Sequence, residues 1–474
     1  MTMHVLIVED DPEFVTALRQ VFADLPGTAD IKVASSRSAA IDLLGKEFFD
    51  LVVLDLKIPT IDGALDADPE HGHAVFAHSL VAAPGTPIFV LTGSPVEEFI
   101  PTMLKRKEQV DVWSEGKKVG TVVFLKKINF DECQAMLTPI AAAIHGLSDV
   151  ELDRGTVNLT LQEDRLIRIF ARKFGGTHCK VSQLGGGLSG AKVVRLLVIN
   201  SGGARVHDAV AKLGSPADVR DEGLRFDNLV SRLEPGATPR KLAVLEFGAG
   251  ALAGIFYGLA EGFKSSAFDV ALHQDGRAAS AITGVEAATK KWTDGVAQTR
   301  RPLRAIRQRV LNDKSLTEIL EKYPIDWAEN FETSQIQTRW ACIHGDLHGS
   351  NILIAENGSA VLIDYGDVGD GPASLDPVTL ELSLLFHPQG VDLGEWPSLE
   401  QARQWGVVES YLEGCPAAEF IRACRQWLSR VSAGNREIAA SAYAYLMRQL
   451  KYNDTNKDLI LALLEGVKSF YDAT

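Results

Sequence analysis

The segment DLVVLDLKIPTIDG, residues 50–63, decides the fold of the first part of the chain. Its apolar run ends at Asp55, and a turn containing Pro and Gly follows, which is the pattern of a buried strand ending in a carboxylate. Four comparable runs flank this one, at HVLIV (4–8), IKVAS (31–35), PIFVLTG (87–93) and TVVFLKK (121–127). The first part of the chain therefore carries five short apolar strands.

Helical patterns alternate with these strands, over residues 12–25, 37–47, 72–82, 95–108 and 130–146. Strands that alternate with helices imply a parallel sheet with helices on both faces. We therefore predict an α/β domain with a five-stranded, doubly wound, flavodoxin-like sheet over residues 1–147.

Three carboxylates stand at the ends of two of the predicted strands. Glu9 and Asp10 follow HVLIV directly, and Asp55 ends LVVLDL. The carboxyl ends of parallel strands meet at one edge of the sheet, where ligands of open α/β sheets bind. Clustered carboxylates repel one another unless a cation relieves them, and an all-oxygen site suits Mg²⁺. A phosphoryl group could then be accepted by Asp55.

The segments VLIVEDDP, DLVVLDLKIPTIDG, VLTG and FLKK, in this order, resemble the signature segments of CheY-like response-regulator receiver domains. The resemblance covers residues 1–147 and implies that Asp55 is the phospho-acceptor, with a cognate sensor histidine kinase as partner. It also implies a Mg²⁺ site formed by Glu9, Asp10 and Asp55. A phosphate switch would be formed by Thr92, Phe124 and Lys127.

Two features depart from the receiver pattern. The family usually has Pro after its lysine, where this chain has Ile128, so Lys126 is an alternative to Lys127 as the phosphate partner. We prefer Lys127 because it keeps Phe124 three residues upstream. The segment KRKEQVDVWSEGKKVG (105–120) also enlarges the distance between the switch residues, on the face that receivers often use for signalling and for pairing into homodimers.

The remainder of the chain divides into a linker and two lobes. Residues 148–162 lose helical periodicity and read as a linker or a short joining strand. A helical pattern from about residue 162 and antiparallel strands with Gly-rich turns then predict a small β-rich lobe over 163–262. Mainly helical patterns follow over 263–474, interrupted by one compact strand-and-loop region.

This strand-and-loop region, CIHGDLHGSNILI (342–354) followed by VLIDYGD (361–367), carries three polar residues in a tight order. Phosphoryl transfer from ATP needs a carboxylate to accept the proton of the attacking hydroxyl, and oxygen ligands for Mg²⁺. Asp346, Asn351 and Asp364 supply that set.

The His-Gly-Asp-Leu-His form of this loop resembles aminoglycoside phosphotransferases and choline kinases, and the likeness extends over about residues 165–474. It implies a two-lobed, α+β, protein-kinase-like fold that binds ATP and Mg²⁺. By the resemblance, Asp346 is the catalytic base, and Asn351 and Asp364 are Mg²⁺ ligands. His344 would brace the loop, and Asp376 in SLDPVTLE would support it.

Upstream segments supply candidates for nucleotide binding. The segment QLGGGLSGAKVVRLLV (183–198) resembles a loop that covers phosphates between two strands. Lys212 matches the strand lysine that grips the α- and β-phosphates, and Glu222 its helix partner, with Asp221 as an alternative. We expect the backbone from Tyr257 to Leu259 to face the adenine. The glycine-loop candidates are Gly186, Gly187, Ser189 and Gly190.

Composition limits the remaining classes. The net charge of −14 and the absence of a basic block argue against a nucleic-acid partner. We expect a cytoplasmic protein without a membrane partner, because no segment reaches the roughly 18 apolar residues of a membrane span and the N-terminus does not resemble a signal peptide. Five scattered cysteines fit reduced core thiols.

Together these patterns predict a two-component response regulator whose output domain is an ATP- and Mg²⁺-dependent phosphotransferase, acting on a hydroxyl of a small molecule or a protein. Phosphorylation of Asp55 would regulate it. Two alternatives remain open: a signalling scaffold with a nucleotide-binding pseudokinase, and a protein Ser/Thr kinase.

Overall fold

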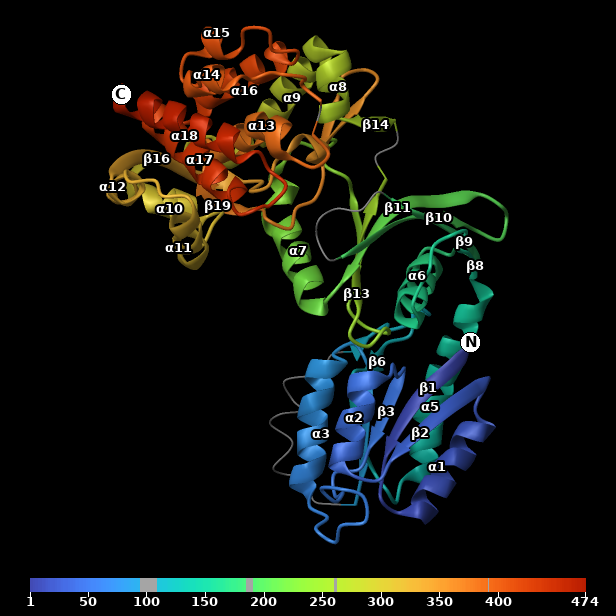
Figure 1. The fold of residues 1–474 in the computed structure, drawn as a ribbon. Coiled ribbons are helices and arrows are strands. Elements are labelled where there is room, and N and C mark those ends of the chain that lie inside the picture. Colours follow the sequence, from blue (N-terminus) through green and yellow to red (C-terminus); the bar gives the residue numbers. More distant parts are fainter. Residues whose placement is uncertain (94–108, 185–190, 260–261, 391) are drawn as a thin grey trace. The chain divides into compact units, whose positions relative to one another are not determined.

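The computed structural model describes residues 1–93, 109–184, 191–259, 262–390 and 392–474 (Figure 1). By its internal contacts the chain forms two compact units. The first unit contains Met1–Gly223 with Arg240–Leu259, and the second contains Leu224–Pro239 with Ala260–Thr474. The expected receiver domain and β-rich lobe therefore share a single compact unit.

The first part of the first unit is the expected parallel sheet. Five strands lie in the order β2-β1-β3-β4-β7, and every neighbouring pair is parallel. The prediction of a five-stranded parallel sheet is confirmed. The strands are β1 (Thr2–Val8), β2 (Thr28–Ala34), β3 (Leu51–Leu54), β4 (Ile88–Thr92) and β7 (Val122–Lys126).

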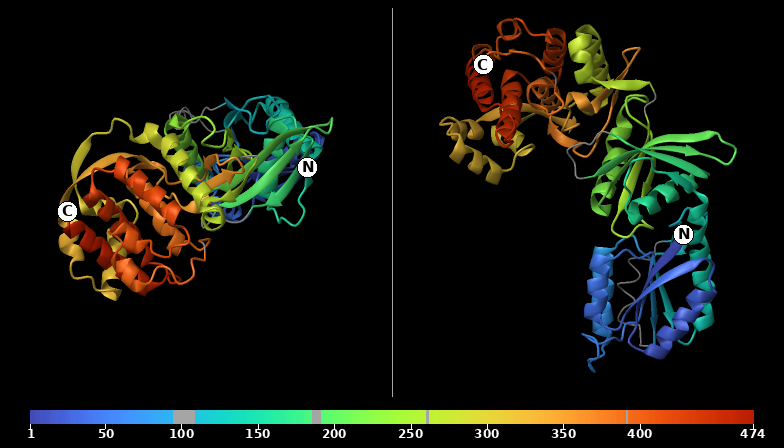
Figure 2. Two further views of the ribbon diagram at one scale, coloured as in Figure 1. Left: turned by 90° about the horizontal axis from the view of Figure 1, so that it is seen from above. Right: turned by 45° about the vertical axis from the view of Figure 1, so that its right-hand side comes forward.

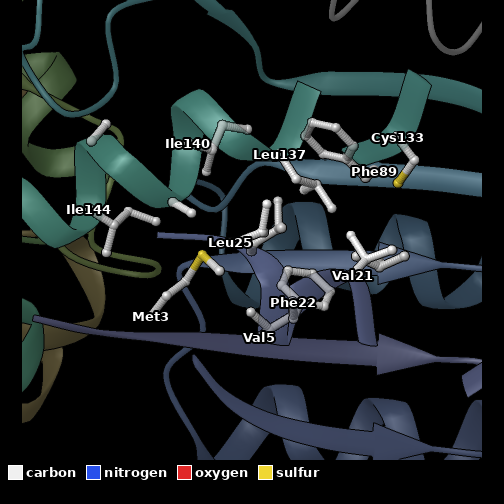
Figure 3. Packing of buried hydrophobic residues seen from close by; sticks show 14 of the residues in the cluster. Met3, Val5, Val21, Phe22, Leu25, Phe89, Cys133, Leu137, Ile140 and Ile144 are labelled. Carbon is white, nitrogen blue, oxygen red and sulfur yellow. The ribbon is translucent and has the colours of Figure 1, made fainter. Parts of the chain in front are cut away.

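Helices cover both faces of this sheet because alternate residues of each strand point to opposite faces. Val5 and Ile7 of β1 pack with α1 (Pro12–Asp24) and α5 (Phe130–His145), in the core shown in Figure 3. Other strand residues pack with α2 (Arg37–Lys46) and α3 (Pro69–Ala82). The helix expected over 95–108 lies outside the described residues.

The expected β-rich lobe contains a six-stranded sheet in the order β12-β13-β11-β10-β9-β8. Its central pairs are antiparallel as predicted, whereas β8 runs parallel to β9 and comes from the segment expected as a linker or a short joining strand. The strands are β8 (Glu151–Asp153), β9 (His178–Gln183), β10 (Lys192–Ile199), β11 (Arg205–Gly214), β12 (Lys241–Leu245) and β13 (Ala253–Gly258).

Helix α6 (Leu161–Lys173) lies against this sheet, as the further views show (Figure 2). It begins at a capping box in which the side chains of Thr160 and Glu163 satisfy each other's backbone N–H groups. Phe170 of α6 stacks on Phe256 of β13, with ring centroids 4.1 Å apart. The helix is thus fixed to the strand that neighbours β11.

The opposite side of α6 packs against the parallel-sheet domain. Arg165 donates from Nη2 to Asp50 Oδ2 at 2.8 Å and to the carbonyl oxygen of Thr2, and the Arg165 and Asp50 side chains are fully buried. Ile169 joins the core that also contains α1 and α5. Asp50 precedes β3, so this contact lies at the amino-terminal edge of the sheet.

The segment between Thr92 and Phe124 takes part in the same contact. Its described portion forms a short hairpin of β5 (Gln109–Val110) and β6 (Val119–Gly120). Trp113, within the hairpin, is buried in the core that includes Ile169. Glu115 pairs with Arg172 of α6, Oε1 to Nη2, at 3.3 Å. The insertion therefore helps to join the two domains of the first unit.

The second unit is mainly helical, as expected, but it contains more strand than the single predicted region. Three short strands form the sheet β15-β16-β19, and three others form β14-β17-β18. The strands are β14 (Phe263–Ser266), β15 (Gln298–Pro302), β16 (Gln335–Ile343), β17 (Ile352–Ala355), β18 (Ala360–Leu362) and β19 (Gly369–Pro372).

Helices supply most of the second unit's buried side chains. Figure 1 shows them in colours from yellow-green through yellow and orange to red. They are α8 (Ala267–His273), α9 (Asp275–Thr293), α10 (Leu303–Gln308), α11 (Asp313–Lys322), α12 (Ala328–Thr333), α13 (Leu375–Phe386), α14 (Leu399–Arg403), α15 (Val408–Tyr411), α16 (Ala418–Val431), α17 (Asn435–Gln449) and α18 (Lys457–Asp472). Helix α7 (Pro216–Asn228) has residues in both units. Across the described residues, no helix is long and apolar enough to cross a bilayer.

Candidate active sites

The three carboxylates expected at one sheet edge do lie together. Single oxygen atoms of Glu9, Asp10 and Asp55 all lie within 4.8 Å of one another. The turn after β1 brings Glu9 and Asp10 there, because Asp11 caps α1 by accepting from the N–H groups of Glu13 and Phe14. This set of hard oxygen donors fits Mg²⁺.

Lys127, and not Lys126, reaches this carboxylate pocket. Its Nζ lies 2.6 Å from Glu9 Oε2 and 2.9 Å from Asp55 Oδ2, whereas Lys126 is exposed. Burial alone would lower the pKa of Lys127, but its hydrogen bonds to the two carboxylates outweigh this and raise it. Burial raises the pKa of Glu9 to about 7, despite its bond to Lys127. The geometry therefore favours Lys127 over the alternative.

The other two switch candidates lie on the strands beside this pocket. Thr92 ends β4 and pairs in register with Lys126 of β7. Phe124 is half-buried and packs on the core beneath α2 and α3. Both stand near the carboxyl edge by their place in the strands, and Ile128 beside them is exposed.

The expected lysine and glutamate pair of the β-rich lobe is present. Lys212 Nζ of β11 lies 2.9 Å from Glu222 Oε2 of α7, and Glu222 is buried. The hydroxyl of Tyr257 donates to Glu222 Oε1 at 2.9 Å. Asp221, the alternative partner, has an exposed side chain. The structure therefore brings Lys212, Glu222 and Tyr257 into one cluster.

The remaining candidates for nucleotide binding are the backbone from Tyr257 to Leu259 and the residues of the glycine loop. Leu259 donates its backbone N–H to the carbonyl oxygen of Asp208 at 2.8 Å. Tyr257 itself lies within the ladder of β13, opposite Val210. Gly186, Gly187, Ser189 and Gly190 lie outside the described residues.

The loop expected to be catalytic, in the second unit, has its backbone bound by one carboxylate. Asp376 Oδ2 accepts from the N–H of His344 at 2.7 Å, and its Oδ1 accepts from the N–H of Gly345 at 2.9 Å. His344 Nε2 lies 3.0 Å from the carbonyl oxygen of Ile363. Burial raises the pKa of Asp376, and both backbone bonds oppose that rise. The two bonds to Asp376 fix the backbone directly before the expected base, Asp346.

Asn351 and Asp364, the expected metal ligands, follow this loop. Asn351 donates from Nδ2 to the backbone carbonyl of Asp346 at 2.9 Å. Its own carbonyl accepts from the N–H of Ile363 at 3.0 Å, which ties the two loops together. Asp364 has φ of 64°, a conformation that non-glycine residues adopt at a cost and that is concentrated at functional sites.

Sequence reasoning missed the basic partner of the expected catalytic base. Arg448 of α17 donates from Nη1 to Asp346 Oδ1 at 3.2 Å. The carboxylate raises the pKa of Arg448 against the opposing effect of burial. Arg448 stands 102 residues from Asp346, within a helix with no motif, so no local pattern marks it.

Two histidines adjoin the same carboxylate. His348 Nε2 lies 3.8 Å from Asp346 Oδ2, and its ring stacks on His387 with centroids 4.0 Å apart. Burial, followed by the nearby His387, lowers the pKa of His348 to about 4. His348 is therefore neutral at pH 7, and the positive charge beside Asp346 comes from Arg448.

Comparisons with known proteins match two separate parts of the chain, one for each candidate site. Residues 5–109 match the response regulator receiver domain family, and residues 181–395 match the phosphotransferase enzyme family. No curated protein matches the chain.

Solved structures of both kinds are similar to parts of the chain. A CheY-like receiver domain from Methanospirillum hungatei JF-1 has 16% identity and a TM-score of 0.23, covering 31% of this chain and 98% of its own. A receiver domain of an HD domain-containing protein from Pseudomonas fluorescens Pf-5 has 22% identity and a TM-score of 0.22, covering 30% and 95%. An aminoglycoside-3'-phosphotransferase of type VIII has 18% identity and a TM-score of 0.36, covering 62% and 100%.

Proposed function

Because the chain joins a response-regulator receiver domain to a domain of the phosphotransferase enzyme family, we propose that it transfers a phosphoryl group from ATP to a hydroxyl acceptor under the control of Asp55. The single observation that carries the proposal is the braced catalytic loop. Asp376 holds the backbone before Asp346, and Asn351 holds the backbone after it. A loop fixed on both sides can present a carboxylate to a substrate in one orientation.

In this proposal the candidate site residues of the phosphotransferase domain have defined tasks. Asp346 accepts the proton of the attacking hydroxyl, while Arg448 holds its carboxylate in place. Lys212, held by Glu222, binds the phosphates of ATP. Asn351 and Asp364 would hold Mg²⁺, which neutralises the charge that develops on the transferred group.

The receiver domain would accept a phosphoryl group, where the phosphotransferase domain transfers one. Asp55 accepts a phosphoryl group from the cognate sensor histidine kinase, and Glu9 and Asp10 complete the Mg²⁺ site. Lys127 already bridges Glu9 and Asp55, so it is placed to pair with the phosphate once that group arrives. Thr92 and Phe124 then respond as the switch. We place this activity in the cytoplasm, where its free, mostly buried cysteines stay reduced.

The direct test is a phosphotransfer screen with labelled ATP against hydroxylated metabolites and purified proteins. Label should appear in at least one hydroxyl acceptor, and it should need Mg²⁺. Transfer mainly to proteins would favour Ser/Thr kinase activity. If the chain binds ATP but transfers phosphate neither to an acceptor nor to itself, a pseudokinase scaffold is favoured instead.

Control through Asp55 can be tested apart from the acceptor. Beryllofluoride mimics an aspartyl phosphate, so it should change ATP turnover by about fivefold or more in the unmodified protein. It should change nothing in Asp55→Asn, which cannot bind it productively. The matched control Asp42→Asn removes an exposed carboxylate on α2 and should respond like the unmodified protein. Equal turnover with and without beryllofluoride in both backgrounds would contradict control by the receiver.

A further inference from the structure

The loop that joins β12 to β13 connects the receiver to the helix that carries Glu222. We infer that Arg220 and Glu246 are positioning residues that hold Glu222 against Lys212, and that Gly85 of the receiver sets their position. The inference rests on the proposed phosphotransferase activity and assigns its means of regulation. The contacts that carry it all lie within the first unit.

The first contact is a pair of backbone hydrogen bonds between the receiver and the loop. Gly85 donates its N–H to the carbonyl oxygen of Gly250, and its own carbonyl accepts from the N–H of Gly248, both at 2.9 Å. The fit is close, since a Cβ on Gly85 would lie 2.6 Å from the carbonyl oxygen of Glu246. The loop is thus seated directly on the receiver backbone.

The second contact joins this loop to α7. Arg220 donates from Nε to Glu246 Oε2 at 2.8 Å, and Glu246 follows β12 directly. Arg220 stands two residues before Glu222 on the same helix, so the two side chains point to different sides of α7. Arg220 reaches the loop, while Glu222 reaches Lys212. A displacement of the loop would therefore rotate or shift the part of α7 that carries both Arg220 and Glu222.

The receiver strands link this contact to the phosphorylation pocket. Gly85 lies just before β4, whose other end is Thr92, and Asp50 lies just before β3, whose other end leads to Asp55. The pocket and the kinase contact therefore occupy opposite ends of the same two strands. A hydrogen-bonded parallel sheet is stiff, so a rearrangement around a phosphate at one end can tilt the strands at the other. The buried Arg165–Asp50 pair would fix the start of β3, beside the start of β4 at Gly85, which we expect to shift.

The sharpest test changes the receiver far from the nucleotide. In Gly85→Ala the added methyl group pushes the loop away, so the KM for ATP should rise about fivefold or more with a smaller change in kcat. Gly45→Ala is the matched control, because a Cβ there meets nothing within 4 Å. Circular dichroism and Tm establish that both variants are folded. An equal KM for ATP in the two variants would overturn the inference.

A charge swap tests the link itself and does not depend on Gly85. Arg220→Glu and Glu246→Arg should each raise the KM for ATP, and the double variant should restore it. A merely structural role would instead change the Tm of the single variants with no effect on the KM. Restored Tm without restored KM in the double variant would count against the inference.

Hydrogen exchange separates failure of this inference from failure of the proposed function. If no acceptor is ever phosphorylated, the proposed function fails, but binding of Mg²⁺-ATP and exchange rates are still measurable. Beryllofluoride should then alter exchange of the amides in 216–223 and 246–250 in the unmodified protein, and less in Gly85→Ala. Unaltered exchange in both segments would overturn the link.

Discussion

Asp346→Asn is expected to lower kcat for phosphotransfer by about 10²–10⁴-fold, because the amide cannot accept the proton of the acceptor hydroxyl. ATP binding should be unchanged, since Lys212, which we propose binds the phosphates, and its partner Glu222 lie in the other compact unit. Single-turnover transfer of labelled phosphate measures the first quantity, and equilibrium binding of a non-hydrolysable ATP analogue measures the second.

The matched control for this prediction is Asp454→Asn, which makes the same chemical change on an exposed loop after α17. It should retain full activity. Asp346→Asn also takes away the charge partner of Arg448, so its Tm should be recorded beside the rates. Phosphotransfer at the unmodified rate by Asp346→Asn would show that another group serves as the base.

Arg165→Leu is expected to lower the free energy of unfolding of the first unit by about 3–5 kcal/mol, because it leaves Asp50 buried without a cation. Burial already raises the pKa of Asp50, and the guanidinium of Arg165 opposes that rise. Urea unfolding, followed by hydrogen exchange of the amides in the first unit, measures the change apart from the unfolding of the second unit.

The companion variants make this second prediction specific. Asp50→Leu should be similarly destabilised, whereas the double variant Asp50→Leu/Arg165→Leu should regain most of the loss, since apolar pairs often replace buried ion pairs at little cost. The surface pair Lys46–Asp42 supplies the control, because Lys46→Leu should change stability by about 0.5 kcal/mol or less. Equal unfolding curves for Arg165→Leu and the unmodified protein would contradict a structural role for the buried pair.

Much of the fold and both sites could be predicted because their signals are local. The carboxylates of the receiver follow apolar strands directly, and parallel strands bring their ends to one edge without further information. The residues of the expected catalytic loop likewise lie within one short stretch of the sequence. Lys127 could be preferred over Lys126 by its spacing from Phe124, and the structure shows it in contact with both Glu9 and Asp55.

The features that escaped prediction depend on pairings between distant single residues. Arg165 and Asp50 are 115 positions apart, and Arg448 and Asp346 are 102 apart. A lone charged residue in a helix reads as solvent-exposed until its partner is known, so neither pair leaves a pattern. The strand β15, with the sequence QTRRP, also gave no signal, because its polar residues lack the alternation of a half-buried strand.

The buried Arg165–Asp50 pair has a consequence for how the chain can be recombined. Here the kinase-side helix carries a guanidinium that needs a carboxylate at the start of β3, and an apolar face that needs the receiver core. A chimera with a foreign receiver before residue 148 should aggregate unless that receiver presents both. For this protein, the pair of domains is therefore the part that has to be moved together.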